Sequence, residues 1–594
     1  MQSVACTQHA SARRRFPIAQ SWLACADFVV GRVKAAHPVH LPAVPIDAAR
    51  PHILTVSLEE YFHSDALCGA VLQKHWDRFE PRIDRSADRV LKALDQHGAK
   101  ATFFVLGILA ERNQGLVRRI VAAGHEVASH GFWPRSVHGM QVEDFAADLD
   151  RAVAAIAAAG GLVRGYRSPR WLCSDDLWVL ETLAKKGYSY DASINPVGRK
   201  FAALPQFHTV RKHDVAGAER GIFEVPLSVA SWAGYRYAVA DGHSLRQLPY
   251  PMVLRAAARW HRERREPLVC SVTSWEFDPE QPRVTAVKAL HRRRQYRNLD
   301  CLAERLQGYL RRYRFTGILD HLQRVQGLPV RGPVVVSPLA FPPAPIVIQS
   351  AIPQRSTAPL AVSLVVPMFQ EEQSIAYFLR TIDAVRERFV ATHAITLICV
   401  DDCSRDRTWE LLSKACEGRT NMKLLRHEQN RGVAAAIQTG IRAASTEIVC
   451  SMDCDCSYDP MELLQMIARL GDADLVTASP YHPDGQVLNV PRWRLCLSRT
   501  LSFMYRRILG KPLYTWTSCC RVYRRSKVAQ IELLHGDFLG MAEMLVRLLR
   551  RGGVVCEYPT LLEARLLGVS KMKTLRTVRG HIALLFFVLS GRIR

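Results

Sequence analysis

The chain has 594 residues, enough for several domains, because roughly 100–200 residues is usual for one domain. Its hydrophobic content of 48% and charged content of 23% are typical of globular proteins and exclude a mainly disordered chain. The formal net charge of +25 favours anionic partners such as nucleic acid, membranes or phosphorylated substrates. Because the sequence has no zinc-finger spacing, no RNA-binding aromatic signature and no clear helix-turn-helix, we expect no nucleic acid partner.

Residues 1–49 carry arginines at positions 13–15 ahead of a moderately apolar stretch. Gln20, Ser21 and Asp27 interrupt that stretch and no convincing cleavage site follows, so we expect a disordered or weakly helical leader rather than a signal peptide. No segment reaches the roughly 18 apolar residues of a membrane span. The 16 cysteines are scattered without the spacing of a disulfide framework, which predicts a reducing compartment.

Residues 50–327 are predicted to form one α/β domain, because apolar strand-like runs alternate with amphipathic helical patterns from Ile53 onward. The alternation favours parallel strands in either a barrel or an open sheet. In chain order, six segments read ILTVSLEEYFH, KATFFVLGILAER, AAGHEVASHGF, GYRSPRW, YSYDASI and SWEFDPEQPR. Over most of residues 50–325 they resemble the polysaccharide deacetylases of the NodB-homology type. The resemblance implies a distorted (β/α) barrel with a metal-dependent amide hydrolysis site at the strand ends.

The resemblance also implies an aspartate base, an acidic metal ligand, two histidine ligands and a late histidine acid, and three of these are missing. Ser57 stands at the base, Pro134 at the second histidine ligand and Thr273 at the acid. Serine is not basic enough at neutral pH, proline offers a metal no lone pair, and threonine cannot protonate a leaving amine as an imidazolium would. We therefore expect neither zinc nor amide hydrolysis here, and a domain that binds glycan or acts as a scaffold. This degenerate site comprises Ser57, Glu59, His130, Pro134, Arg167 and Thr273.

A bifunctional polysaccharide deacetylase and glycosyltransferase is the alternative function for the whole chain. It requires Glu60 to replace the base and His138 to replace the missing ligand, because the remaining two ligands would leave zinc without its usual three. Arg167 and Trp171 are the expected glycan contacts, and a structural salt bridge is the alternative role of Arg167.

Residues 328–361 are crowded with Pro, Val, Ala and Gln, and proline favours extended backbone, so we predict a semi-rigid linker. Beyond it, residues 362–580 repeat a strand–loop–helix pattern with acidic loops at corresponding strand ends. The expected strands are 362–367, 395–400, 422–425 and one that runs up to Asp453. This is the layout of a nucleotide-binding parallel sheet.

The fourth strand leads directly into Asp453 and Asp455, whose spacing lets both carboxylates face one divalent cation. Ligands collect at the carboxyl ends of strands in open α/β sheets, and hard oxygen ligands suit Mg²⁺ or Mn²⁺. For such a pair by itself, an Asp-rich turn after a strand is the alternative explanation. The neighbouring Cys450, Cys454 and Cys456 have no second ligand cluster and are interpreted as core residues rather than zinc ligands.

The motifs PMFQEE, DDCSRDRT, NRG, DCD and RLLGVSK together resemble the inverting family 2 glycosyltransferases of the GT-A, Rossmann-like fold. They are closest to the polyprenyl-phosphate sugar synthases, of the dolichol-phosphate mannosyltransferase kind. The resemblance implies metal-dependent transfer of a sugar from a nucleotide-sugar donor to a lipid-phosphate or glycan acceptor, in cell-envelope polysaccharide or glycolipid synthesis.

The same resemblance implies roles for individual residues. Nucleotide-sugar binding is assigned to Pro367, Phe369, Glu371, Asp401, Asp402 and Asp453. Metal binding is assigned to Asp453, Asp455 and Ser457, the last of which replaces a common Gln. Catalysis is assigned to Asp453, Asp455 and Glu543. Acceptor or phosphate binding is assigned to Arg499, Arg565, Ser570 and Lys571.

Two C-terminal segments are candidates for contact with an anionic membrane surface. Residues 493–509 mix arginines with large apolar residues in a basic amphipathic helix, and residues 581–594 form an apolar and basic tail too short to span a bilayer. A solvated helix with a core face is the alternative for the first segment, and a buried core helix for the second. We expect a cytoplasmic protein attached peripherally to the inner face of the cell membrane.

Overall fold

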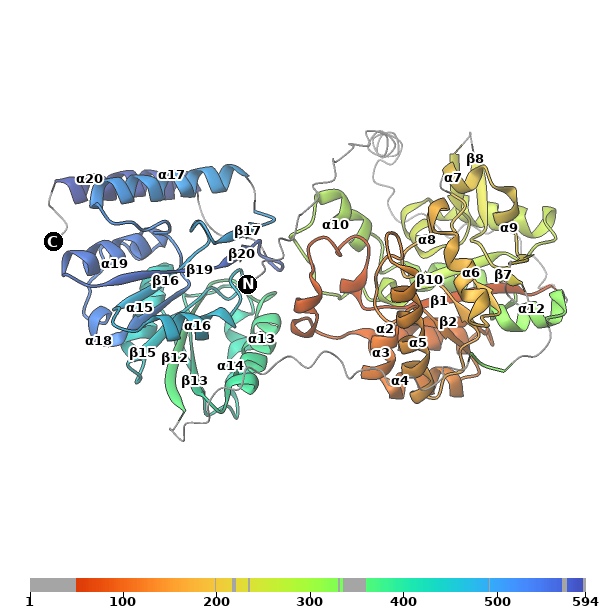
Figure 1. Cartoon of the computed structure of the whole chain (residues 1–594), viewed down its shortest axis with the longest axis horizontal. Coiled ribbons are helices and arrows are strands. Elements are labelled where there is room, and N and C mark those ends of the chain that lie inside the picture. Colours follow the sequence, from red (N-terminus) through yellow and green to blue (C-terminus); the bar gives the residue numbers. More distant parts are fainter. Residues whose placement is uncertain are drawn as a thin grey trace, which may run out of the picture. The chain divides into compact units, whose positions relative to one another are not determined.

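The computed structural model describes residues 50–197, 199–215, 221–232, 235–328, 332–334, 359–490, 492–568 and 574–590. We call residues 50–328 the first domain and residues 359–590 the second domain (Figure 1). The predicted leader, most of the predicted linker, and the predicted acceptor residues Ser570 and Lys571 lie outside the described residues.

The first domain is built on a curled, mostly parallel sheet in the order β10-β1-β2-β3-β4-β5-β7-β6, with β11 also paired to β1. The strands are β1 His52–Leu58, β2 Thr102–Val105, β3 Glu126–Ser129, β4 Gly165–Tyr166, β5 Tyr190–Asp191, β6 Arg211–His213, β7 Ile222–Glu224, β10 Val269–Thr273 and β11 Phe315–Thr316. A separate hairpin joins β8 Val229–Trp232 and β9 Tyr235–Ala238. Every residue of β1 is buried, which explains its continuous apolar run. The predicted distorted barrel is confirmed as this curled sheet.

Helices connect the strands of the first domain. They are α2 Ile83–Asp95, α3 Gly107–Arg112, α4 Gln114–Ala122, α5 Val142–Ala158, α6 Trp178–Lys185, α7 Arg199–Ala202, α8 Gly242–Gln247, α9 Tyr250–Glu263, α10 Ala289–Tyr296, α11 Leu302–Leu310 and α12 Ile318–Gln326. Short 3₁₀ turns span Tyr61–His63, Gln73–Arg78, Ser174–Asp176, Pro205–Phe207 and Ser274–Phe277.

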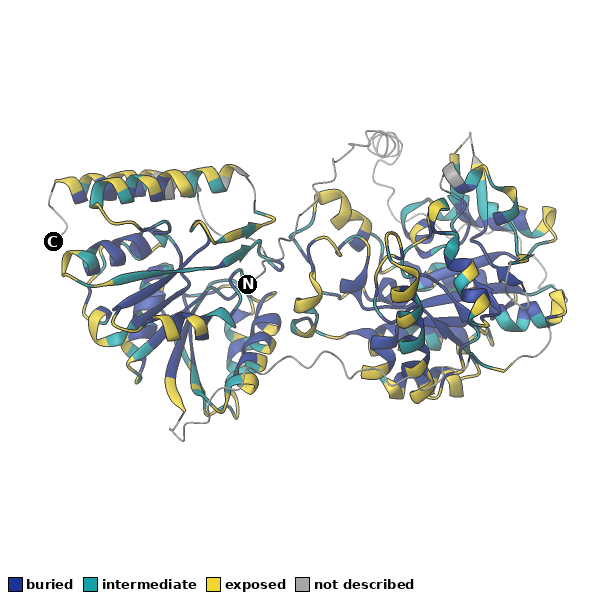
Figure 2. Cartoon of the chain, in the orientation of Figure 1, coloured by how far each residue is buried: buried dark blue, intermediate teal, exposed yellow. Residues whose placement is uncertain are grey.

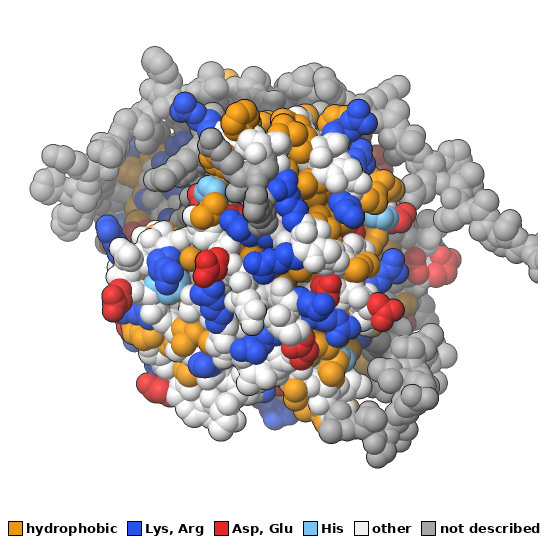
Figure 3. Space-filling view, turned by 90° about the vertical axis from the view of Figure 1, so that its left-hand side faces the viewer, with side chains coloured by type: hydrophobic (Ala, Val, Ile, Leu, Met, Phe, Trp, Pro, Cys, Tyr) orange, Lys and Arg blue, Asp and Glu red, His pale blue; other side chains and the backbone are white. Residues whose placement is uncertain are grey.

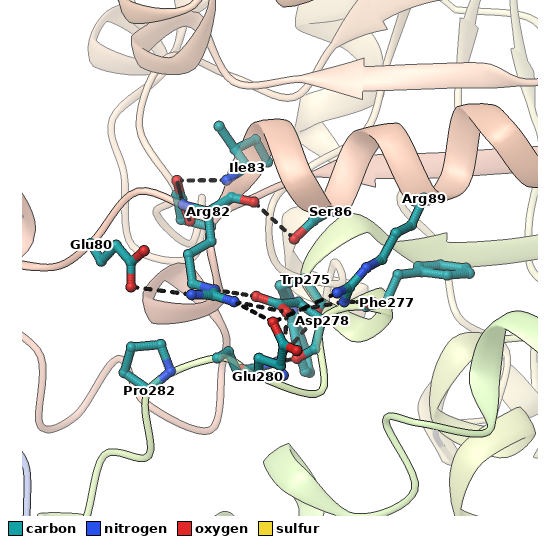
Figure 4. A network of polar contacts seen from close by, with 12 residues as sticks. Glu80, Arg82, Ile83, Ser86, Arg89, Trp275, Phe277, Asp278, Glu280 and Pro282 are labelled. Atoms are coloured by element: carbon teal, nitrogen blue, oxygen red, sulfur yellow. Dashed lines mark hydrogen bonds and ion pairs between the residues drawn. The ribbon is translucent and has the colours of Figure 1, made fainter. Parts of the chain in front are cut away.

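An ionic network fixes the start of α2 (Figure 4). The Arg82 guanidinium donates to Asp278 and to Glu80, and Arg89 donates to the same Asp278 carboxylate. The Glu60 carboxylate accepts the backbone N–H groups of Arg82 and Ile83 at 2.9 and 3.1 Å, so it satisfies donors that a helix N-terminus leaves open. Glu60 is therefore committed to α2.

The second domain contains a sheet in the order β14-β13-β12-β15-β18-β16-β19. The strands are β12 Leu360–Met368, β13 His393–Asp401, β14 Met422–Arg426, β15 Ile448–Ser451, β16 Leu475–Ser479, β18 Arg521–Arg524 and β19 Val555–Pro559. The short strands β17 Gln486–Leu488 and β20 Leu561–Glu563 pair with each other. The four predicted strands are confirmed, but β18 is antiparallel to both of its neighbours. Its sequence, Arg-Val-Tyr-Arg, lacks the apolar run that reveals a buried strand, so this reversal is not predictable from the sequence pattern.

The helices of the second domain are α13 Ile375–Phe389, α14 Thr408–Cys416, α15 Val433–Ala443, α16 Glu462–Arg469, α17 Arg492–Leu509, α18 Arg525–Val528, α19 Phe538–Arg550 and α20 Thr574–Leu589. Helix α20 lies beside α17 and α19 (Figure 1) and packs Leu584, Leu585 and Val588 into their shared core. Residues 581–589 of the predicted tail are thus part of a longer helix with a core face, whereas its other face exposes Ile582 and Phe586 (Figure 2). Residues 591–594 of the predicted tail lie outside the described residues. Within the described residues, no helix combines the length and apolarity needed to cross a membrane.

Candidate functional site

Acidic side chains from two neighbouring strands meet at one edge of the second domain's sheet. Strand β12 is followed by Glu371 and strand β15 by Asp453 and Asp455; since these strands are parallel neighbours, their following loops meet. Arg565, from the segment after β20, joins the loops. Its Nε donates to Asp455 Oδ2 at 2.7 Å and its Nη1 donates to Glu371 Oε1 at 2.9 Å. We call Glu371, Asp453, Asp455 and Arg565 the carboxylate cluster.

The carboxylate cluster holds more negative than positive charge. Burial, and then the neighbouring charge of Asp455, raise the pKa of Asp453 to about 7. Burial also raises the pKa of Glu371, although Arg565 opposes this effect. One guanidinium therefore faces three carboxyl groups. Asp453 and Asp455 offer the hard oxygen donors that Mg²⁺ or Mn²⁺ prefers, and such a cation keeps its other positions for water and substrate phosphates, so three converging protein ligands are not required. Asp453 and Asp455 would hold it.

The predicted third metal contact, Ser457, lies beside Asp455. Its backbone N–H donates to Asp455 Oδ1 at 2.9 Å, so the turn after β15 orients this carboxylate. The role of the Ser457 hydroxyl toward a metal stays a prediction. Cys450, Cys454 and Cys456 are buried in the core, as predicted.

The Asp401–Asp402 pair lies at the end of β13, and its carboxylates are bound by donors outside the carboxylate cluster. Arg426 Nε lies 3.1 Å from Asp401 Oδ2. Asp402 accepts the backbone N–H groups of Arg431 and Gly432 at 2.8 and 2.7 Å. These bonds tie β13 to the Asn-Arg-Gly turn that starts α15, and a nucleotide contact by either aspartate stays a prediction. Pro367 and Phe369, at the end of β12, are both half-buried.

Glu543 has the contacts of a structural residue. It is fully buried on α19 and accepts the backbone N–H groups of Leu534 and His535 at 2.9 and 3.0 Å. His535 Nδ1 and Arg547 Nε add further bonds to it, and these donors hold the pKa of Glu543 below its ordinary value against the opposing effect of burial. The geometry favours anchoring of the loop before α19 over the predicted catalytic role, which stays untested.

Arg499 is exposed on α17, with its guanidinium 5.8 Å from the centre of the Tyr481 ring. It presents its charge at the surface, where it is accessible to an anionic group. Arg565, by contrast, is already engaged by carboxylates. The two predicted phosphate contacts therefore differ in environment.

The first domain keeps only part of the deacetylase constellation. His130 Nδ1 lies 2.7 Å from the Arg167 carbonyl oxygen, which accepts its N–H, and His130 Nε2 is 3.5 Å from Glu59 Oε1. Both side chains are buried, and both line a cavity inside the curled sheet. Burial favours a raised pKa for Glu59, but His130 and other nearby bases hold it below its ordinary value. A histidine and a carboxylate are thus in place as the resemblance implied.

The substitutes needed for hydrolysis do not reach this pair. Glu60 is bound to the start of α2 instead of lining the cavity. His138 is exposed and its Nδ1 lies 3.0 Å from Asp176, with Cys173 nearby. This trio is the one group of three candidate ligands that converges among the described residues, and it excludes Glu59 and His130. The donor set around His130 therefore does not fit a zinc site with three protein ligands.

Sequence motifs missed other residues that line the first-domain cavity. Arg246 pairs with Glu276 through a 2.9 Å bond from Nε, and both are buried there. Asp241 accepts the Ser244 N–H as the N-cap of α8. The cap pattern predicts the helix start, but no local signal reveals that α8 borders a cavity.

Comparison with known families gives three matches along the chain. Residues 77–190 match Polysaccharide deacetylase, residues 192–323 match a Domain of unknown function (DUF3473), and residues 363–531 match Glycosyl transferase family 2. The region expected to form one deacetylase-like domain is thus covered by two family descriptions.

Individual relatives share the C-terminal part of the chain. Dodecaprenyl-phosphate galacturonate synthase of Rhizobium johnstonii is 28% identical over 238 residues, 39% of this chain and 68% of the relative. Polyprenol monophosphomannose synthase of Mycolicibacterium smegmatis is 29% identical over 218 residues, 35% of this chain and 80% of the relative. A crystal structure of glucosyl-3-phosphoglycerate synthase from Mycobacterium tuberculosis with Mn²⁺, uridine-diphosphate and glucosyl-3-phosphoglycerate is 19% identical, with a TM-score of 0.31, and covers 39% of this chain and 80% of that chain.

Proposed function

We propose that this chain, which joins a polysaccharide deacetylase domain to a family 2 glycosyltransferase domain, transfers a sugar from a nucleotide-sugar to a lipid phosphate with Mg²⁺ or Mn²⁺. The observation that carries the proposal is the carboxylate cluster at the ends of β12 and β15. A bound divalent cation would supply positive charge to the diphosphate that leaves the sugar.

The residues of the cluster have separate tasks in this proposal. Asp453 and Asp455 hold the cation and, through it, orient the diphosphate. Arg565 keeps Asp455 and Glu371 in place, and its charge lies where the leaving diphosphate needs compensation. Glu371 positions Arg565 in turn. The acceptor phosphate is already ionised at neutral pH, so this chemistry requires no general base, in agreement with the buried position of Glu543.

The names of the relatives support an assignment of the acceptor class, but they do not support an assignment of the transferred sugar. Both named synthases act with a polyprenyl phosphate, whereas one is named for galacturonate and the other for mannose. We therefore assign a polyprenyl phosphate acceptor and a nucleotide-sugar donor.

The exposed face of α17 and α20 supports peripheral attachment to a membrane. It carries Trp493, Phe503, Ile582, Phe586 and Leu589, all at least half exposed, together with Arg499 and Arg507. Figure 3, which views the end of the second domain that lies on the left in Figure 1, shows Lys and Arg side chains spread over that end, with hydrophobic side chains among them. Large apolar residues beside cations suit the interface of an anionic bilayer, where a lipid phosphate is presented.

For the first domain we propose that the deacetylase fold is retained but does not hydrolyse amides. Ser57 and Thr273 offer hydroxyls where a base and an acid are required, and Pro134 is buried without a ligand atom. The Glu59–His130 pair is the observation that favours the bifunctional alternative, but no third ligand joins it among the described residues.

The test of the transferase is to incubate the full chain with radiolabelled sugar nucleotides and a membrane lipid extract, with and without a chelator. We expect one donor to label a lipid fraction in a reaction that stops with excess EDTA and restarts with Mn²⁺ or Mg²⁺. Labelling that is unchanged in EDTA would refute the role of the metal. Labelling of a water-soluble product in place of lipid would refute the acceptor.

A further inference from the structure

The first domain contains a cavity of about 150 Å³ that opens to solvent, and its lining is mostly polar. Ser57 from β1, Thr273 from β10 and Arg167 from the segment after β4 contribute to it, with Trp171 close by. Because Ser57 and Thr273 stand where a deacetylase has its base and its acid, we look for another use of this polar space. The contacts of Arg167 indicate what could occupy it.

Arg167 extends across the interior of the curled sheet. Its Nε donates to the Ala192 carbonyl at 2.9 Å, and its Nη1 donates to Thr55 Oγ1 and Ser271 Oγ, both at 2.9 Å. Its Nη2 has no hydrogen-bond partner among the described residues, although the side chain is only 2% exposed. A buried guanidinium with an unused donor is costly unless an acceptor reaches it.

The other arginines around the cavity are in different situations. Arg170 pairs with Asp65 and Arg246 pairs with Glu276, whereas Arg294 is exposed. Arg167 forms no ion pair with a described carboxylate. Asp191 and Glu224, whose charges act on Arg167, accept the backbone N–H groups of Ser193 and Ile194, respectively, and burial raises the pKa of both carboxyl groups. Burial lowers the pKa of Arg167 to about 10, which leaves it charged at neutral pH.

Ser57 explains why this cation lacks a partner. Residues two apart on a strand point to the same face, so Ser57 shares a face with Thr55, the residue that binds Arg167 Nη1. An acidic side chain at position 57 would therefore lie on the side of the strand where the guanidinium is. Serine there supplies no charge and leaves space in the cavity.

We propose that the first-domain cavity binds the carboxylate of an acidic sugar, a uronate unit of a glycan, beside the buried guanidinium of Arg167. The sugar carboxylate takes the place of the missing acidic side chain and compensates the charge of the guanidinium. Trp171 is 39% exposed and its ring centre is 5.7 Å from the Arg167 guanidinium carbon, so an aromatic face is available beside the anion for the sugar ring.

The charges of the lining favour a carboxylate over a phosphate. Glu59, Asp241 and Glu276 also line the cavity, so a second negative charge on the ligand would be repelled. A monoanion balances the buried guanidinium of Arg167, which has no ion pair among the described residues. This inference does not depend on the transfer reaction, and it holds or fails separately from it.

The most direct test introduces an acidic side chain at position 57. We compare the full-length protein with Ser57→Asp and Ser57→Ala by calorimetric titration with trigalacturonate, its trimethyl ester and inorganic phosphate. Wild type and Ser57→Ala should bind trigalacturonate with affinities within about twofold of each other. Both should bind the uncharged ester at least tenfold more weakly than trigalacturonate, a difference of about 1.4 kcal/mol in binding free energy. Ser57→Asp should lose at least tenfold in affinity for trigalacturonate, because its own carboxylate engages Arg167.

Thermal unfolding of each variant shows whether it is folded, and Trp171→Ala provides a second variant away from the strand. It should weaken trigalacturonate and ester alike, because it removes a sugar contact rather than a charge. Equal affinity for the acid and the ester, or unchanged affinity in Ser57→Asp, would overturn the proposal. Phosphate that binds as tightly as trigalacturonate would show a general anion site and overturn the assignment to a uronate.

Discussion

Two arginines, one in each domain, are surrounded by opposite balances of charge. In the second domain Arg565 faces Glu371, Asp453 and Asp455, so negative charge is in excess. In the first domain Arg167 is buried against hydroxyls, a carbonyl and the Phe104 ring, so its positive charge has no ion-pair partner among the described residues. An excess of carboxylates calls for a cation, and an excess of cationic charge calls for an anion.

The difference shows how one chain can keep two polar centres for different purposes. At Arg565 the charge imbalance matches a reaction, because a metal ion and a diphosphate can complete it. At Arg167, serine and threonine stand at the positions of the expected base and acid, so we propose that this centre serves binding alone. The predictions below test each side of this comparison.

The largest effect is expected in the second domain. Asp455→Ala should lower sugar transfer by about 10²–10³-fold, because it removes a carboxylate that holds the cation and orients Arg565. Initial rates with saturating donor measure the loss. The control is Glu410→Gln, which alters an exposed ion pair on α14 and should leave the rate unchanged. Full activity of Asp455→Ala would show that the carboxylate excess has no catalytic meaning.

The second prediction tests whether the first domain is inert. The full chain, supplied with zinc and N-acetylated oligosaccharides, should release acetate no faster than a blank without protein, because base, acid and third ligand are missing. Acetate is measured by coupled assay and bound zinc by elemental analysis. Acetate release that scales with one bound metal per chain would show that the first domain reacts after all, and the contrast with the second domain would disappear.

Most of the fold follows from local sequence patterns. Buried strands such as β12 and β15 are predictable because they appear in the sequence as apolar runs, and the acidic residues after them indicate the sheet edge. Strand β18 does not, because it alternates polar and apolar residues and its direction depends on its neighbours in the sheet. The tail was predicted as a separate interfacial segment because the contacts that bury one side of α20 come from α17 and α19, remote in sequence.

The candidate sites were predictable only where residues act close together in sequence. The aspartates 453 and 455 are visible as a motif, whereas the donors that occupy Glu543 and Asp402 are backbone groups, which no residue pattern reveals. The unpaired Nη2 of Arg167 depends on segments more than 100 residues apart. The replacement of the expected base by Ser57 is visible in the sequence. That this replacement leaves the Arg167 guanidinium without an ion-pair partner is visible only in the structure.

A smaller effect is expected at the surface of the second domain. Phe586→Ser should weaken binding to anionic vesicles by about tenfold, since it removes a large apolar side chain that is 64% exposed on α20. Flotation at low and high salt measures binding, and the salt sensitivity of the wild type reports the arginines of α17. Val390→Ser, equally exposed after α13, is the matched control and should bind as wild type. Equal flotation of both variants, or none for the wild type at low salt, would contradict the membrane face.

The smallest effect concerns acid stability, and it rests on a buried neutral histidine in the first domain. His52 Nδ1 accepts the Leu268 backbone N–H at 2.9 Å, and its Nε2 lies 2.9 Å from His261 Nδ1. Burial, then the charges of His261 and Arg50, lower the pKa of His52 to about 3. A proton on Nδ1 would break the bond from Leu268, which links β10 to β1.

The sign follows from proton binding. Between pH 6.5 and 3 the unfolded chain protonates this histidine and the folded chain does not, so the stability is fully present above pH 6.5 and is lost as the pH falls toward 3. At pH 5 the loss is about 2 kcal/mol in the free energy of unfolding. Urea unfolding at pH 7 and pH 5, followed for wild type and His52→Gln, measures it. The variant should be less stable at pH 7 but should lose about 2 kcal/mol less than the wild type on acidification; equal losses would show that His52 does not contribute to acid sensitivity.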